Sequence, residues 1–184
     1  FGVPFSEKDT VFFGAALERM DIKNGTNIPA YYLQYAEEVG NPSNTLPLTI
    51  GWSSDTKDSA LIPTRGTFQR FNTEWGVAGD ARYLKAYYQF QYYLPITRDF
   101  TAAFNSEFGW GTGLSGKPFP VFKNFYAGGV NSVRGFKAGS LGPQTWNPAV
   151  STDTYAIGGK ERVIGQAELL WGVPGMEKSV RLGW

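Results

Sequence analysis

Residues 82–94 alternate apolar and polar side chains over an unusually long run. As a β-strand, this segment would place on one face Leu84, Ala86, Tyr88, Phe90, Tyr92 and Leu94. The opposite face would carry Tyr83, Lys85, Tyr87, Gln89, Gln91 and Tyr93. A period of two residues is typical of a β-strand with two different faces, and it argues against a helix over this stretch. The segment therefore predicts a long amphipathic strand that needs strand partners on both sides.

The same alternation recurs along the chain and predicts about seven strands and a stub. The other segments are residues 1–5, 10–21, 46–54, 66–77, 99–110 and 160–171, with the stub at 180–184. Most are long enough to cross a bilayer, which takes a tilted strand of about 9–11 residues. Polar faces rich in Gln, Glu, Lys and Arg would suit a wet lumen, and apolar faces would meet lipid. Tryptophans near the strand ends suggest interfacial girdles, namely Trp52, Trp75, Trp110 and Trp171. The sequence thus predicts an all-β fold that is part of a transmembrane antiparallel β-barrel.

The connections between these segments are long on one side and short on the other. Residues 22–45 and 112–159 form the long loops, whereas residues 95–98 form a short turn on the opposite side. Short turns on one side and long external loops on the other are typical of outer-membrane barrels. Inside the first long loop, apolar residues at helical spacing follow Pro29 and precede Gly40, which predicts a short amphipathic helix over the barrel rim at residues 30–39.

The composition agrees with a β-rich membrane protein. Aromatic residues make up 16% of the chain, and its 23 Gly and 11 Pro favour many strands and turns. A net charge of +1 argues against a dedicated nucleic-acid-binding protein. The mean hydropathy of −0.27 suits barrel strands, because alternation averages apolar and polar residues. A soluble β-sandwich is the alternative, although its strands are usually shorter and its polar face carries more charge.

No catalytic, metal or cofactor site is predicted. The chain has neither histidine nor cysteine, which argues against Ser-His-acid and Cys-His nucleophiles and against zinc. Residues 111–117 fit the spacing of a dinucleotide loop and of a phosphate loop, but Pro118 follows where both motifs need a helix to begin. We interpret this segment as a flexible exit from a strand, and we do not expect an enzyme.

The second long loop contains an unusual combination of residues at its centre. Gly128 and Gly129 permit backbone angles with positive φ or a close backbone approach, and Val133-Arg134-Gly135-Phe136 follows. The Arg134 guanidinium is a permanent cation whose donor fork suits a carboxylate. These residues predict a loop that docks onto another part of the protein, with Phe136 as an apolar anchor. The alternative is an ordinary long loop with one isolated arginine.

The glycine pair followed by Val133-Arg134-Gly135-Phe136 resembles the loop signature of the BamA family of outer-membrane β-barrel assembly proteins. Residues 63–66 are similar to a short periplasmic turn of that family, and residues 122–126 to the approach to its sixth external loop. The resemblance extends over effectively the whole chain. It implies that residues 1–184 are a partial outer-membrane barrel domain, the second half of a barrel of about sixteen strands. We expect the chain to be truncated at both ends, with loop 112–159 carrying the motif.

The resemblance also implies a function and a place. The protein would be an assembly factor in the outer membrane of a Gram-negative bacterium, where it would fold and insert β-barrel proteins. Its partners would be unfolded outer-membrane proteins, accessory lipoproteins and outer-membrane lipid, with no nucleic acid. A two-partner secretion transporter of the same superfamily stays open as an alternative, because such transporters carry a similar loop. A diffusion porin is disfavoured, since its constriction loop would need several charges and loop 112–159 has few.

We hypothesise that Arg134 pairs with Glu168, which lies with Gln166 on the polar face of the strand after the loop. The family resemblance implies a glutamate partner at the same strand position. Glu107 is the competing partner. If the pair is buried, breaking it from one side would cost about 3–5 kcal/mol. Gly129 and Gly135 would serve the backbone geometry of the loop.

Overall fold

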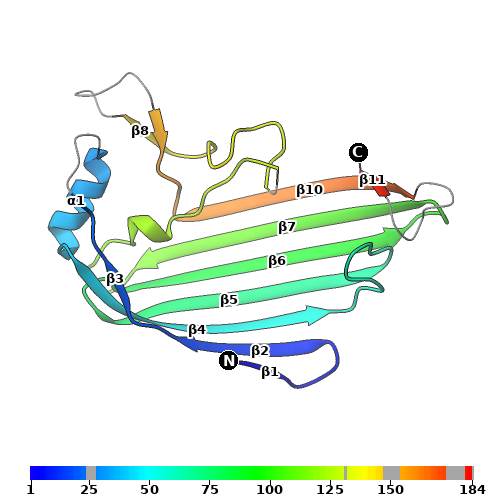
Figure 1. The fold of residues 1–184 in the computed structure, drawn as a ribbon, viewed down its shortest axis with the longest axis horizontal. Helices are drawn as coiled ribbons and strands as arrows, with labels where there is room; N and C mark the ends of the chain where they lie inside the picture. The colour runs from blue at the N-terminus through cyan, green and yellow to red at the C-terminus, as the bar shows by residue number, and fades with distance from the viewer. Residues whose placement is uncertain (24–27, 131, 147–153, 173–180, 184) are drawn as a thin grey trace.

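The computed structural model describes residues 1–23, 28–130, 132–146, 154–172 and 181–183. In this part of the chain, one antiparallel nine-stranded sheet has the order β1-β2-β4-β5-β6-β7-β10-β11, and β3 also pairs with β4. Figure 1 shows a curved, open sheet with β1 and β11 at its two edges. Its strands are β1 (Gly2–Pro4), β2 (Asp9–Ala15), β3 (Glu18–Met20), β4 (Ser43–Asp55), β5 (Gly66–Gly79), β6 (Tyr83–Pro95), β7 (Phe100–Gly113), β10 (Glu161–Gly172) and β11 (Arg181–Gly183).

Two further groups of elements lie in the long loops. The first loop contains helix α1 (Ala30–Val39), and the second contains the short 3-10 helix η1 (Val121–Lys123). A small two-stranded sheet of β8 (Gln144–Trp146) and β9 (Thr154–Ala156) completes the second loop. None of the helices in the described ranges is long and apolar enough to cross a membrane.

The long strands confirm the predictions from alternation. Strands β4, β5, β6, β7 and β10 coincide with the predicted segments, although β6, β7 and β10 begin one residue later, and each extends beyond its segment by one to three residues. They pair in sequence order from β4 to β7, and β10 then pairs with β7 across the second long loop. Of the predicted stub at 180–184, residues 180 and 184 lie outside the described residues, and β11 covers the rest.

The prediction of one continuous strand over residues 10–21 is wrong. The segment is divided into β2 and β3, which pair with the same strand β4 in one common register. The interruption falls at Ala16 and Leu17, opposite Pro47 and Leu46 of β4. Pro47 has no N–H to donate to the ladder, and the pairing of β4 with β5 is irregular between Leu46 and Pro47. The missing donor therefore explains why the strand breaks there.

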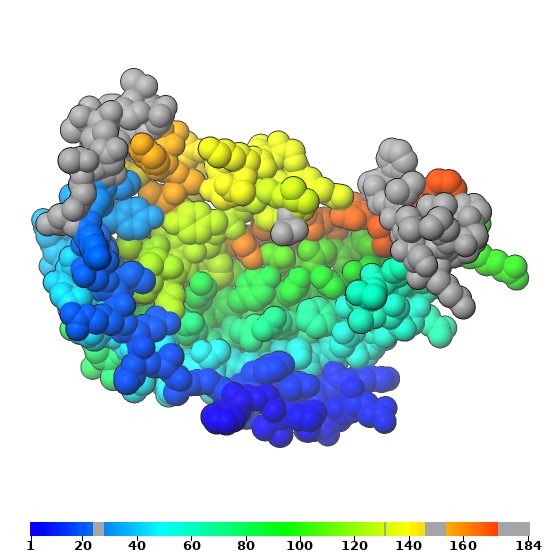
Figure 2. Space-filling view, viewed as in Figure 1, coloured from blue at the N-terminus to red at the C-terminus, as the bar shows by residue number. Residues whose placement is uncertain are grey.

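The two faces of the sheet have opposite character. One face is apolar and exposed, with Val163 75% accessible to solvent. Other exposed apolar side chains of the sheet include Phe13, Ile50, Phe71, Trp75, Phe104, Phe108 and Trp110. The opposite face is polar and hollowed, and the second long loop lies over it in Figure 2. In a soluble sheet the apolar face packs on a core, so this arrangement is inverted.

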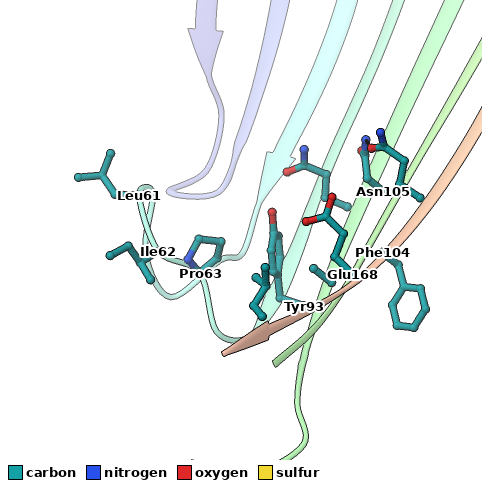
Figure 3. A pocket seen from close by; sticks show the side chains of 11 residues that line it. Leu61, Ile62, Pro63, Tyr93, Phe104, Asn105 and Glu168 are labelled. Atoms are coloured by element: carbon teal, nitrogen blue, oxygen red, sulfur yellow. Dashed lines mark hydrogen bonds between the residues drawn. The ribbon is translucent and has the colours of Figure 1, made fainter. Parts of the chain in front are cut away.

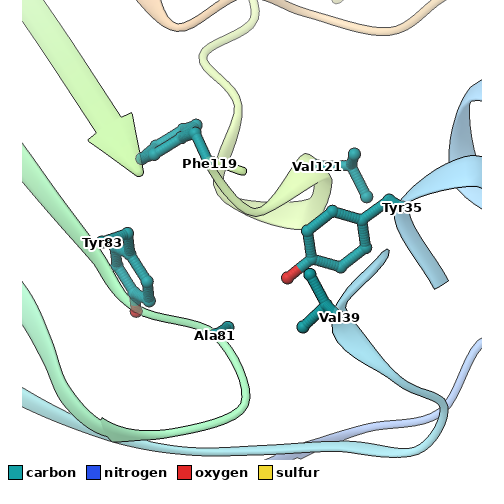
Figure 4. Packing of buried hydrophobic residues seen from close by; sticks show 6 residues of the cluster. All are labelled: Tyr35, Val39, Ala81, Tyr83, Phe119 and Val121. Atoms are coloured by element: carbon teal, nitrogen blue, oxygen red, sulfur yellow. The ribbon is translucent and has the colours of Figure 1, made fainter. Parts of the chain in front are cut away.

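The small apolar core lies at one end of the sheet, where the two long loops meet (Figure 4). Helix α1 was predicted from residues 30–39, and it packs here through Tyr35 and Val39. Their neighbours are Ala81 and Tyr83 near the start of β6 and, from the second loop, Phe119 and Val121. Both loops are thus fixed to each other and to the same end of the sheet.

Candidate functional site

The second long loop returns across the polar face of the sheet as soon as β7 ends. Strand β7 continues to Gly113, so the prediction that residues 111–117 form a flexible exit is wrong for Gly111 and Gly113. Phe119 then packs edge-on against Tyr83 with a centroid distance of 6.0 Å. Gly111 and Gly113 pair with Lys85 and Tyr83 of β6, so the glycines continue the sheet where a flexible exit was expected.

A cluster of charges holds the next part of the loop. Lys123 Nζ lies 2.7 Å from Glu74 Oε1 and 2.9 Å from Glu18 Oε2. Tyr83 donates its hydroxyl to the same Glu74 oxygen at 2.5 Å. Burial alone would lower the pKa of Lys123, but the hydrogen bonds and charges of Glu74 and Glu18 outweigh it and raise that pKa. Lys123 is therefore a fixed cation that joins the loop to β5 and to β3.

Sequence reasoning did not identify Lys123. Its neighbours Phe122 and Asn124 gave no signal of a charge pair, and Glu74 lies far away along the chain. The available clue was that Lys85 and Glu74 share the polar faces of neighbouring strands. Lys85 instead donates to the carbonyl oxygen of Lys123 at 2.8 Å and leaves Glu74 to the loop lysine.

A second charge pair follows at the base of the motif. The Arg162 Nη2 atom lies 2.5 Å from Glu107 Oε2, and Nη1 donates to the carbonyl oxygen of Tyr126 at 2.8 Å. Glu107 is only 8% exposed, and its buried charge is neutralised by Arg162 of the adjacent strand β10. The predicted competitor for Arg134 is therefore already paired, within the part of the chain that the structure describes.

The motif glycines adopt the backbone angles that their residue type allows. Gly128, Gly129 and Gly135 have φ values of 109°, 97° and 87°. The N–H of Gly129 donates to the carbonyl oxygen of Phe136 at 3.0 Å, which closes the loop tip. A Cβ at Gly128 would lie 2.5 Å from the carbonyl oxygen of Lys137, so this position also needs a close backbone approach. Residue 131, between these glycines, lies outside the described residues.

The expected packing role of Phe136 is not what the structure shows. Its side chain is 53% exposed, and the residue contributes to the loop through its backbone carbonyl. The physical reason is that the tip is held by polar groups: Gln166 donates to the carbonyl oxygen of Ser132 and Arg134 reaches Glu168. Val133, between these two contacts, is partly buried.

The structure brings Arg134 and Glu168 together, with Nη2 of the guanidinium against Oε1 of the carboxylate. The Arg134 side chain is 53% exposed and that of Glu168 is 28% exposed. The pair is therefore not a buried one, and the cost of 3–5 kcal/mol expected for a buried pair does not apply.

Beside Glu168 the polar face is hollow. A cavity of about 410 Å³ is lined by Glu168, Tyr93 and Asn105 from the sheet and by Leu61 and Pro63 from the β4–β5 turn. Figure 3 shows the sheet residues Tyr93, Asn105 and Glu168 on the side of this turn, whereas Phe104 points to the other side of the sheet. Within the described ranges, no group of three or more acidic residues is placed to hold a metal ion.

Comparisons with known proteins agree with this geometry. The model of the Omp85 superfamily domain matches residues 1–184. The outer membrane protein assembly factor BamA of Neisseria meningitidis serogroup B is 32% identical over 98% of this chain and 24% of that protein. The Sorting and assembly machinery component 50 homolog of Mus musculus is 30% identical over 57% of this chain and 23% of that protein.

A solved structure has the same fold. The crystal structure of BamA from Haemophilus ducreyi lacking POTRA domains 1–3 matches with a TM-score of 0.85 and 21% identity, over 99% of this chain and 38% of that one. The chain spans about a quarter of the length of the curated relatives it matches. The superfamily match over the whole chain carries the family assignment: the chain belongs to the Omp85 superfamily.

Proposed function

We propose that the protein containing this chain folds and inserts β-barrel proteins into the outer membrane of a Gram-negative bacterium. Relatives that bear the name of an outer membrane protein assembly factor support the activity and the membrane. The bacterial setting is supported by the similarity to two bacterial assembly factors, although relatives from animals also match. Residues 1–184 would be the second half of the barrel domain, including loop 112–159.

The observation that carries this proposal is a loop that docks on the polar face of an open sheet whose other face is apolar. An exposed apolar face suits lipid, and a polar face suits the inside of a barrel. Two ion pairs attach the loop to the sheet, those of Lys123 and Arg134, and Arg162 of β10 donates a hydrogen bond to the Tyr126 carbonyl oxygen of the loop. These contacts support the interpretation of the loop as a fixed internal element. A diffusion porin would instead need free charges along an open passage.

The partners follow from the same proposal. Substrates would be unfolded outer-membrane proteins, whose strands could add to an exposed sheet edge by β-augmentation. Outer-membrane lipid would contact the apolar face, and accessory lipoproteins would complete the complex. We assign no catalytic step and no cofactor to the chain, because binding and strand pairing would account for the proposed activity.

A secretion transporter of the same superfamily is the alternative function. It would use a similar barrel and a similar loop, so the Arg134 motif does not separate the two. The number of periplasmic domains ahead of the barrel in the full-length protein would separate them.

A charge exchange in the full-length protein tests the proposal. Arg134→Glu should place two carboxylates at the docking contact and reduce the assembly of a porin, scored by its folded amount in the outer membrane. Adding Glu168→Arg should restore the attraction and recover assembly. Arg134→Lys is the matched control that keeps the charge. Normal porin assembly by Arg134→Glu would contradict the proposal and favour the secretion transporter.

A further inference from the structure

Three glycines of β7 lie on the polar face beneath the loop. Gly109, Gly111 and Gly113 alternate along the strand, so they share the face on which Glu107 points. None of the three has a φ in the left-handed region. The backbone at these positions therefore accepts any residue. If glycine is required here, the reason must be that a side chain has no room.

The loop fills the space that the absent side chains leave. A Cβ at Gly111 would lie 2.3 Å from Cζ of Phe119, and a Cβ at Gly109 would lie 2.7 Å from Cε1 of Phe125. At Gly113 it would lie 1.9 Å from the carbonyl oxygen of Lys117. Such separations are too short for real atoms, so a side chain at any of the three positions would displace the loop.

The two rings have little freedom to move aside. Phe119 is 2% exposed and Phe125 is 8% exposed. The Lys85 ammonium lies 4.5 Å from the centre of the Phe125 ring, and the Arg162 guanidinium lies 5.8 Å from it. Cations at this range attract an aromatic face. Phe125 is also paired through its backbone with Gly159, by hydrogen bonds of 2.8 and 2.9 Å.

We propose that Gly109, Gly111 and Gly113 are positioning residues that form a seat for loop residues 117–125. The seat holds this part of the loop against β7 independently of the contact between Arg134 and Glu168. The seated part of the loop is closely packed, whereas the ion pair of Arg134 with Glu168 is partly exposed. We therefore expect the seat to be the stronger of the two attachments. The link from seat to barrel assembly rests on the proposed function, but the seat itself does not.

Limited trypsin digestion of the purified full-length protein tests the seat. Lys123 belongs to the seated segment and its side chain is 14% exposed, whereas Lys137 is exposed beyond the motif. Overpacking at Gly111→Ala or Gly109→Ala should speed cleavage after Lys123 by roughly tenfold or more, because cleavage follows the open population. Cleavage after Lys137 serves as the internal reference.

Matched variants separate the seat from general damage. Gly165→Ala adds the same methyl group to the neighbouring strand β10, where a Cβ meets no atom within 4 Å, and should leave Lys123 protected. Phe119→Leu combined with Gly111→Ala should restore protection, because leucine lacks the ring atoms that clash. Arg134→Ala should also leave Lys123 protected, since the seat does not depend on the tip.

The outcomes distinguish the seat from the proposed function. Protection of Lys123 in Gly111→Ala, or its loss in Arg134→Ala, would overturn the seat. If Gly111→Ala exposes Lys123 and porin assembly stays normal, the seat stands and the proposed role of the docked loop in assembly fails. If Gly111→Ala loses both the protection of Lys123 and porin assembly, and adding Phe119→Leu recovers both, the result supports a role of the seat in barrel assembly.

Discussion

The Arg162 guanidinium lies 2.5 Å from the Glu107 carboxylate, on the polar face between β10 and β7. With Glu107 paired inside the sheet, Glu168 is the carboxylate of β10 that Arg134 reaches. The two pairs also differ in burial, because the side chains are 20% and 11% exposed in the first and 53% and 28% exposed in the second.

The buried pair should matter more for stability than the motif pair. Arg162→Ala would leave Glu107 as an uncompensated buried charge, and we expect the free energy of unfolding to fall by about 3–5 kcal/mol. Urea unfolding of the full-length protein in detergent micelles measures this change. Adding Glu107→Gln should recover part of the loss, because it removes the stranded charge. A loss below that of Arg134→Ala would contradict the ranking.

Arg134→Ala should have a small effect on global stability and a local effect on dynamics. A half-exposed pair contributes about 0.2–1 kcal/mol, so the unfolding midpoint should hardly move. Hydrogen exchange should become faster at residues 128–141, where the tip loses its link to β10. Exchange at residues 119–125 should stay slow. Uniformly faster exchange across the loop would mean that the motif pair holds the whole loop.

Lys123→Ala should loosen the loop near its first attachment. The change leaves the hydrogen-bonding oxygens of Glu74 and Glu18 without their cation, and we expect a loss of about 1–3 kcal/mol. Lys137→Ala is the control, because it removes an exposed lysine from the same loop. The urea midpoints of the two variants provide the comparison, and equal midpoints would show that the Lys123 cluster contributes nothing.

The sequence predicted what repeats along the chain and missed what depends on distant partners. Alternation located β6 within a residue or so, and proline and glycine located α1, since both signals are local. The split of β2 from β3 depends on Pro47 in another strand, and the strand conformation of Gly111 depends on its pairing with Lys85 of β6. The contact of Arg134 with Glu168 was hypothesised from the polar face of the strand and from the family resemblance, whereas nothing in the sequence marked Lys123.

The exposed apolar face provides the last prediction. Ala167 lies near the middle of β10 on this face, paired with Phe104. If the face meets lipid, Ala167→Arg should destabilise the barrel by about 2–4 kcal/mol, the cost of a cation at the bilayer midplane. The same change at an exposed position of a soluble sheet would usually stay within about 0.5 kcal/mol.

Gln91→Arg is the control at the same depth on the polar face. Gln91 is in register with Asn105, which is in register with Gln166, the residue that precedes Ala167. It lines the cavity beside Glu168, where water and a carboxylate suit a cation. The folded fraction of each full-length variant in lipid vesicles gives the two costs. A large destabilisation by Ala167→Arg with a small one by Gln91→Arg would support an exterior that faces lipid. Equally small effects of the two changes would favour the soluble β-sandwich.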